Sequence, residues 1–291
     1  MDPTAVVERL WPDEQVVIAP LGGGITNHNF KVVVGGEAFV LRIGGKDTEL
    51  LGIDRRHEHE ASLAAAHAGV APEVVRFVES EGYLVTRFVE GRPIPPEEMR
   101  RPDNLERVAR LLRAVHGGEP LAARFDSFRV VEAYRAEAAS RGVEPPTAYA
   151  EAKRIADAVE RKRAVSPPFR CHNDLLNANF IDGGGRLWLV DWEYAGTGDR
   201  FFDLANFSVN HELGPDEDRL LLRTYFGEAR EEDVAALMLM RFMSDFREAM
   251  WGVVQQAISE LDFDFAGYAA RHFERLERTA GEEGFRRALG T

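Results

Sequence analysis

The chain has little cysteine and no long apolar run, and each scarcity excludes a class of protein. Cys171 is the only cysteine among 291 residues, so an internal disulfide is impossible and a reducing compartment is expected. No stretch approaches the roughly 18 consecutive apolar residues that a membrane-spanning helix needs. The N-terminal residues Met1 to Thr4 are polar and acidic, so they do not predict a signal peptide. We therefore expect a cytoplasmic protein without membrane insertion.

Basic residues are also scarce. The 36 Lys and Arg residues are outnumbered by 49 Asp and Glu residues, which gives a formal net charge of −13. This balance argues against nucleic acid and anionic membrane as partners and is compatible with a cationic substrate. Apolar residues make up 45% and charged residues 29%, a mixture typical of a globular protein with a sizeable core. The composition leaves both a monomer and a homodimer open.

The two parts of the chain have different periodicities. The first part predicts strands and two helices separated by glycine turns, at residues 5–10, 15–21, 29–34, 37–43, 54–68, 74–78 and 83–89. The second part predicts mainly helices, at residues 104–115, 131–139, 147–163, 216–225, 232–258 and 265–279. We therefore predict an α+β fold with two lobes. Residues 1–89 would form a small antiparallel β lobe carrying one main helix, and residues 90–291 a larger, mainly helical lobe.

One segment, residues 171–179, carries most of the chemical information. The residues that follow it, 180–190, have the pattern of a β-hairpin with a glycine-rich turn. Because a hairpin returns its far end to its start, we expect Asp191 to lie beside Asp174 and Asn179. The carboxylates of Asp174 and Asp191 and the carboxamide of Asn179 would then lie close together in space, although they are separated in sequence.

These residue types suit a magnesium-dependent phosphoryl-transfer site. Asp174 has the position of a catalytic base that accepts a hydroxyl proton. Asn179 and Asp191 have the positions of Mg²⁺ ligands, because hard oxygen donors suit a hard cation. We expect His172 to brace this catalytic loop rather than to bind the metal. Cys171 could be a nucleophile, but the chemistry of its neighbours favours a small buried residue.

A glycine-rich segment in the first lobe is suited to phosphate contacts. Gly23 and Gly24 would let backbone N–H groups approach phosphate oxygens, and Thr26 and Asn27 would add side-chain donors. The segment is not a Walker loop, since no Gly-Lys-Ser/Thr follows it. Taken alone, it is also typical of a plain hairpin turn.

Arg42 lies at the end of the third predicted strand, where it could bind phosphates or face water. Glu58 on the following helix could hold Arg42, as a helix glutamate does in kinase-type sites. Glu60 is the alternative partner, because it is close by in the sequence.

Together these residues resemble the choline/ethanolamine kinase family, within the wider group of aminoglycoside-phosphotransferase-like and protein-kinase-like folds. The resemblance covers most of the chain and rests on six segments: 22–30, 40–42, 69–72, 172–179, 191–206 and 251–259. It implies an Mg²⁺- and ATP-dependent kinase that transfers a phosphoryl group to the hydroxyl of choline, ethanolamine or a related small amino-alcohol. ATP would lie between the lobes, with the glycine-rich segment and Arg42 at its phosphates. The backbone from Arg87 to Val89 would meet the adenine.

The resemblance also implies an acceptor site. Glu193, Tyr194, Trp251 and Tyr268 match positions around the family's amine pocket. A quaternary ammonium has no N–H to donate, so aromatic faces and a carboxylate hold it best, at roughly 0.5–2 kcal/mol per cation–π contact. Trp251 and Tyr268 could instead be helix core residues. Eukaryotic members carry a second tryptophan where this chain has Glu248, which favours a cation but not specifically a trimethylated one.

Three functions stay open at this point. The first is the amino-alcohol kinase. The second keeps the fold and phosphorylates an aminoglycoside or another small molecule, with a thiamine-like acceptor included. The third is a catalytically silent nucleotide-binding module, against which the intact Asp174, Asn179 and Asp191 argue.

Overall fold

A five-stranded antiparallel sheet forms the N-terminal lobe of the structure, a computed structural model that describes residues 3–22, 27–163 and 167–290. Its strands run in the order β1-β2-β3-β5-β4: β1 (Val16–Leu21), β2 (Asn27–Val34), β3 (Glu37–Gly44), β4 (Val74–Val78) and β5 (Tyr83–Arg87). Gly35 and Gly36 make the tight turn between β2 and β3, at φ of 59° and 84°. Only glycine adopts this left-handed backbone at little cost, and it matches the twist of the paired strands.

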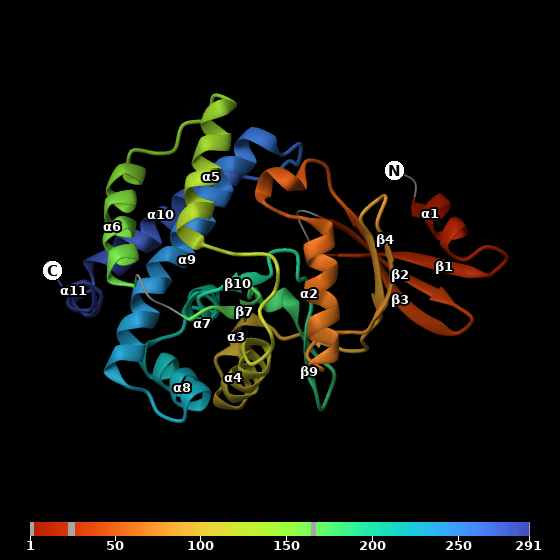
Figure 1. Cartoon of the computed structure of the whole chain (residues 1–291), viewed down its shortest axis with the longest axis horizontal. Helices are drawn as coiled ribbons and strands as arrows, with labels where there is room; N and C mark the ends of the chain where they lie inside the picture. The colour runs from red at the N-terminus through yellow and green to blue at the C-terminus, as the bar shows by residue number, and fades with distance from the viewer. Residues whose placement is uncertain (1–2, 23–26, 164–166, 291) are drawn as a thin grey trace.

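Helices flank this sheet on two sides. Helix α1 (Pro3–Leu10) buries Val6, Val7 and Leu10 against the sheet. Helix α2 (Arg55–His67) begins at Asp54, whose carboxylate accepts two backbone N–H groups of the first turn. Figure 1 shows α2 standing between the sheet and the helical lobe. This helix therefore carries its side chains to the junction of the lobes.

The helical lobe is built around one long central helix. Its helices are α3 (Pro96–Met99), α4 (Pro102–His116), α5 (Ser127–Ser140), α6 (Ala148–Lys162), α7 (Arg200–Asn210), α8 (Pro215–Phe226), α9 (Glu231–Ile258), α10 (Phe265–Gly281) and α11 (Glu283–Leu289). The 28 residues of α9 pack against α5, α7 and α10. Among the helices of the described residues, none combines the length and apolar character of a membrane span.

Short strands form two small sheets after the five-stranded sheet. These strands are β6 (Arg92–Pro93), β7 (Phe169–Cys171), β8 (Phe180–Asp182), β9 (Leu187–Leu189) and β10 (Gly196–Gly198), and they pair in the orders β10-β7 and β6-β8-β9. Strands β8 and β9 form the expected hairpin, and two single-turn helices, η1 (Thr48–Leu51) and η2 (Asn177–Asn179), complete the connections. The hairpin thus starts directly at the end of the catalytic loop.

The predicted two-lobed α+β fold is confirmed, with one informative miss. Helix α7 was not expected, because residues 201–209 are all buried, polar side chains included. Its polar side chains Asp203 and Asn206 bind the backbone of the catalytic loop instead of facing water, and the sequence alone does not distinguish such residues from the polar residues of a loop. The boundary between residues 89 and 90 stays a prediction.

Candidate active site

Two side chains of α7 hold the catalytic loop in place. The fully buried carboxylate of Asp203 accepts the backbone N–H of His172 at 2.8 Å and that of Asn173 at 2.7 Å. The amide oxygen of Asn206 accepts the backbone N–H of Leu175 at 2.6 Å. The loop is thereby tied to the core of the helical lobe on both sides of residue 174.

His172 supports the loop from within. Its Nε2 donates to the carbonyl of Val190 at 3.0 Å, and its Nδ1 accepts the backbone N–H of Asp174 at 3.3 Å. Burial lowers the pKa of His172, which keeps the ring neutral with one donor and one acceptor nitrogen. The geometry is that of a brace between the loop and the hairpin.

Cys171 lies beside the loop but is fully buried. Burial raises the pKa of its thiol well above the ordinary value, and the carboxylate of Asp203 acts in the same direction. A thiol that resists ionisation is a poor nucleophile, so Cys171 acts as a small buried residue.

The structure brings Asp174, Asn179 and Asp191 together. The Asn179 amide nitrogen donates to the backbone carbonyl of Asp174 at 2.9 Å and approaches its carboxylate at 3.4 Å. The backbone N–H of Val190 donates to the carbonyl of Asn179 at 3.0 Å, which places Asp191 at the same point. Asp191 has a φ of 70°, a left-handed conformation that aspartate tolerates better than most residues. The hairpin argument from the sequence thus describes the observed geometry.

This cluster offers oxygen atoms that suit Mg²⁺. Because the Asn179 nitrogen is bound to Asp174, its amide oxygen is the atom that it can offer a cation. One carboxylate oxygen of Asp191 accepts a hydrogen bond from Arg42, and the second oxygen is the atom that it can offer a cation. An amide oxygen and a carboxylate oxygen are the donors that a hard divalent cation prefers.

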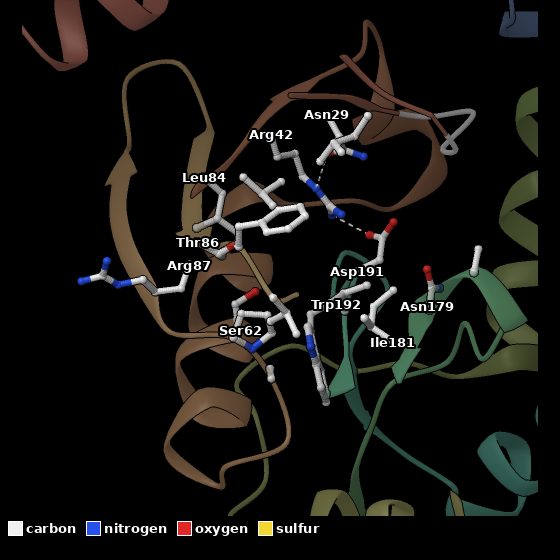
Figure 2. Close-up of a pocket in the computed structure, with 18 of the residues that line it drawn as sticks. Asn29, Arg42, Ser62, Leu84, Thr86, Arg87, Asn179, Ile181, Asp191 and Trp192 are labelled. Atoms are coloured by element: carbon white, nitrogen blue, oxygen red, sulfur yellow. Dashed lines mark hydrogen bonds and ion pairs between the residues drawn. The ribbon is translucent and has the colours of Figure 1, made fainter. Parts of the chain in front are cut away.

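A cavity of about 360 Å³ lies between the lobes, next to this cluster. Its walls are largely apolar: Leu21, Val40, Ala71, Leu84, Ile181 and Trp192. Its polar end is formed by Arg42, Asn179 and Asp191, which Figure 2 shows along one side of the space. The cavity therefore offers an apolar compartment that leads to a charged end.

Arg42 faces this cavity rather than water, so the surface interpretation of this residue is wrong. Its Nη1 donates to Glu58 at 2.7 Å and to Asp191 at 2.5 Å. Burial opposes the charge, but the two carboxylates outweigh it and raise the pKa of Arg42. Glu60 instead accepts a backbone N–H of the helical lobe at 3.2 Å. Glu58 is thus the helix carboxylate that pairs with Arg42.

The segment from Arg87 to Val89 lines the opposite end of the cavity. The Arg87 side chain extends away from the cavity in Figure 2 and pairs with Glu37 and Glu73 at the surface, at 2.9 and 3.3 Å. Its contribution to the cavity therefore comes from the backbone and the base of the side chain.

The structure describes only part of the glycine-rich segment. Gly23, Gly24 and Thr26 lie outside the described residues. Asn27, expected to bind phosphate, is 5% exposed and donates to the Glu193 carboxylate at 2.8 Å. Asn27 is the first residue of β2 and its side chain is buried, so it binds Glu193 where a phosphate contact was expected.

The residues expected around the acceptor do gather on the other side of Asp174. Trp251 Nε1 donates to the Tyr194 hydroxyl at 3.2 Å, and the Trp251 and Tyr268 rings meet edge to face at 5.4 Å. The Tyr268 hydroxyl donates to Glu248 at 2.8 Å. Tyr268 is partly buried and the others are buried. We call Tyr194, Glu248, Trp251 and Tyr268 the acceptor cluster.

Two arginines that were not predicted complete this side of the site. Arg247, 2% exposed, places Nη1 2.5 Å from Glu248 and 4.0 Å from Asp174. Arg55 places Nη1 3.2 Å from Glu193. In the sequence, Arg247 is one of two arginines in the largely apolar α9, and the adjacent Glu248 is the only sign of its partner.

The pKa of Asp174 is set by its burial and by the charged residues around it. Asp174 is 14% exposed, and its burial raises the pKa well above the ordinary value. Arg247 opposes this shift, whereas Glu248 and Asp191 add to it. The carboxylate is therefore basic for its type, which favours acceptance of a proton from a bound hydroxyl.

Two lobes with a cavity between them, and Arg42, Asn179 and Asp191 at its polar end beside Asp174, have the arrangement of a phosphotransferase. Residues 17–239 match the family model described as the phosphotransferase enzyme family. The chain belongs to this family and, by its similarity to a solved member, to the choline/ethanolamine kinase family within it.

That solved member is a choline/ethanolamine kinase family protein from Mesorhizobium loti, 34% identical, with a TM-score of 0.83 over 94% of this chain and 91% of that chain. Human ethanolamine kinase 1 is 26% identical, over 91% of this chain and 68% of its own length. The protein LicA of Haemophilus influenzae is 27% identical, over 87% of this chain and 76% of its own length.

Proposed function

We propose that the chain is an ATP-dependent kinase that phosphorylates the hydroxyl of ethanolamine, choline or a related small amino-alcohol. The observation that carries this proposal is the meeting of Asp174, Asn179 and Asp191 between an open cavity and the acceptor cluster. The similarity to human ethanolamine kinase 1 supports the choice of acceptor. The single cysteine and the acidic composition suit a cytoplasmic site of action.

The nucleotide would occupy the cavity between the lobes. Its base fits the apolar compartment near Val89, and its phosphates fit the charged end near Arg42. Mg²⁺ would be held by Asn179 and Asp191 and would supply charge neutralisation for the phosphates. Glu58 keeps the Arg42 guanidinium at this end of the cavity.

The reaction needs few covalent changes. The acceptor oxygen forms a bond to the γ-phosphorus, the bond from that phosphorus to the bridging oxygen breaks, and ADP leaves. Asp174 orients the hydroxyl and accepts its proton, while the Asn179 amide keeps the carboxylate in place. Positioning of the reactants supplies most of the rate enhancement in such a site.

The size of the acceptor cluster favours a small acceptor. A bulky polycationic acceptor, such as an aminoglycoside, needs an open acidic cleft, whereas Trp251 and Glu248 are 7% and 4% exposed. Tyr194, Trp251 and Tyr268 offer aromatic surfaces to an alkylammonium group.

An acceptor panel tests the proposal. The protein is incubated with Mg-ATP and, separately, with ethanolamine, choline, thiamine and kanamycin, and phosphomonoester products are followed by ³¹P NMR. We expect a product with a small amino-alcohol and none with kanamycin. A product with kanamycin alone would favour the aminoglycoside alternative. ATP binding without any product would favour the silent module.

A further inference from the structure

The carboxylates expected to attract an ammonium group already have cationic partners within the chain. Glu193 is 3.2 Å from Arg55, and Glu248 is 2.5 Å from Arg247. An ion pair offsets most of the field that a lone carboxylate would present to a bound cation. The acceptor side is therefore less selective for a cation than its acidic residues alone indicate.

Arg247 itself has unused hydrogen-bonding capacity. Its Nη1 faces Glu248, but its buried Nε and Nη2 have no hydrogen-bond partner among residues 3–22, 27–163 and 167–290. A buried donor without a partner is uncommon and costly in a folded protein. Nε and Nη2 share one edge of the planar guanidinium, the edge that binds a carboxylate through two parallel hydrogen bonds.

This unpaired edge belongs to a group that already faces the reacting centre. Nη1 of Arg247 is 4.0 Å from the Asp174 carboxylate, and the guanidinium carbon is 4.4 Å from the centre of the Tyr194 ring. One small molecule could therefore present a hydroxyl to Asp174 and an oxyanion to Arg247.

A second cavity, of about 590 Å³, lies between η1 and the C-terminal end of α9. Thr48 lines it and accepts a hydrogen bond from Arg55 at 3.1 Å. Gln255 also lines it and follows Trp251 by one helical turn. Arg55 also pairs with Glu193, so this wall of the cavity is linked to the acceptor side of the site through one side chain.

We propose that the preferred acceptor is an amino-alcohol that also carries a carboxylate, a hydroxy-amino acid. Its carboxylate binds the Nε–Nη2 edge of Arg247 while its hydroxyl faces Asp174. This inference rests on the proposed kinase function and narrows its acceptor class. The transfer step is unchanged, with the γ-phosphoryl group received by the hydroxyl oxygen and the proton by Asp174.

Matched pairs of acceptors test the inference on the unmodified protein. L-Serine and L-homoserine are compared with ethanolamine and 3-aminopropanol, which differ from them only by the missing carboxylate. We expect kcat/KM to be about 10- to 100-fold higher for the carboxylate-bearing member of at least one pair. A preference for the amines in both pairs would overturn the inference and leave the proposed function intact. Phosphorylation of choline but of none of these four would likewise overturn the inference alone, whereas absence of phosphorylation of choline and of all four would count against both.

A variant of Arg247 adds a second test. Arg247→Lys keeps a cation beside Glu248 but removes the Nε–Nη2 edge, so the carboxylate preference should fall about tenfold or more while the KM for ATP stays the same. Arg241→Lys is the matched control, because Arg241 lies on the same helix and pairs with Asp218 at 2.6 Å outside the site. An unchanged preference in Arg247→Lys would contradict the inference. If that variant does not fold, the matched pairs decide on their own.

Discussion

The two sides of Asp174 are built differently. On the nucleotide side, Arg42 and Asp191 border an open cavity of about 360 Å³, and one guanidinium is shared by two carboxylates. On the acceptor side, Trp251 and Glu248 are buried, and the carboxylate has its own arginine. The nucleotide side is therefore preformed to receive a ligand, whereas the acceptor side is closed by its own charges. The difference teaches that acidic residues in a pocket do not by themselves make it selective for a cation.

The largest expected effect concerns the residue at which the two sides meet. Asp174→Ala should lower kcat by about 10²- to 10⁴-fold, because the base that accepts the hydroxyl proton is lost. The fold should persist, since Asp203 and Asn206 hold the loop through its backbone. Steady-state kinetics and thermal unfolding check both statements. Asp262→Ala, at an exposed position, is the control, and normal turnover in folded Asp174→Ala would remove the base assignment.

Arg42→Met should act on the nucleotide side alone. We expect the KM for ATP to rise about 10- to 100-fold, because a charged donor to the phosphates is lost, and the KM for the acceptor to change little. Arg56→Met provides the control, since Arg56 is an exposed arginine on the same helix as Glu58. Equal changes in both KM values would show that the two sides are not separable in this way.

Trp251→Ala should act on the acceptor side. The KM for the acceptor should rise about 3- to 30-fold, in line with the loss of an aromatic face, and more than the KM for ATP. Trp251→Phe keeps a ring and should retain most of the affinity. If both KM values rise together in Trp251→Ala, the residue serves the helix core and the comparison of the two sides weakens.

The smallest effect concerns His211, a buried residue of the helical lobe that packs against Phe180 and Phe207. Burial lowers the pKa of His211, at the end of α7, to about 4. The unfolded chain binds the proton first as the pH falls below about 6.5, so the stabilising contribution of neutral His211 is present above that pH and lost toward pH 4. We expect His211 to account for about 2 kcal/mol of the loss in unfolding free energy between pH 7 and pH 5.

Urea unfolding of His211→Gln at the two pH values checks this statement. The variant should lose about 2 kcal/mol less than the parent protein, with both KM values unchanged at pH 7. An identical loss in the two proteins would show that His211 does not carry this pH dependence.

The nucleotide side could be predicted from the sequence because its key residues are local to one hairpin. Asn179 begins the hairpin and Asp191 ends it, so strand pairing alone brings them together. Arg42 was ambiguous, because its partner Glu58 lies on another element and the pairing depends on how that helix packs.

The acceptor side was only partly predictable. Glu248, Trp251 and Tyr268 came from a family resemblance, and their contacts depend on the packing of α9 against α10. Arg247 could not be assigned a partner, because α9 is buried around most of its circumference and its periodicity indicates no single face.

A crystal structure with Mg²⁺, a non-hydrolysable ATP analogue and the best acceptor from the panel tests the central claim most directly. The account predicts the acceptor hydroxyl within about 2.6–3.2 Å of the Asp174 carboxylate, with the terminal phosphate of the analogue at Asn179 and Asp191. An acceptor hydroxyl bound away from Asp174, or an analogue outside the cavity between the lobes, would contradict it.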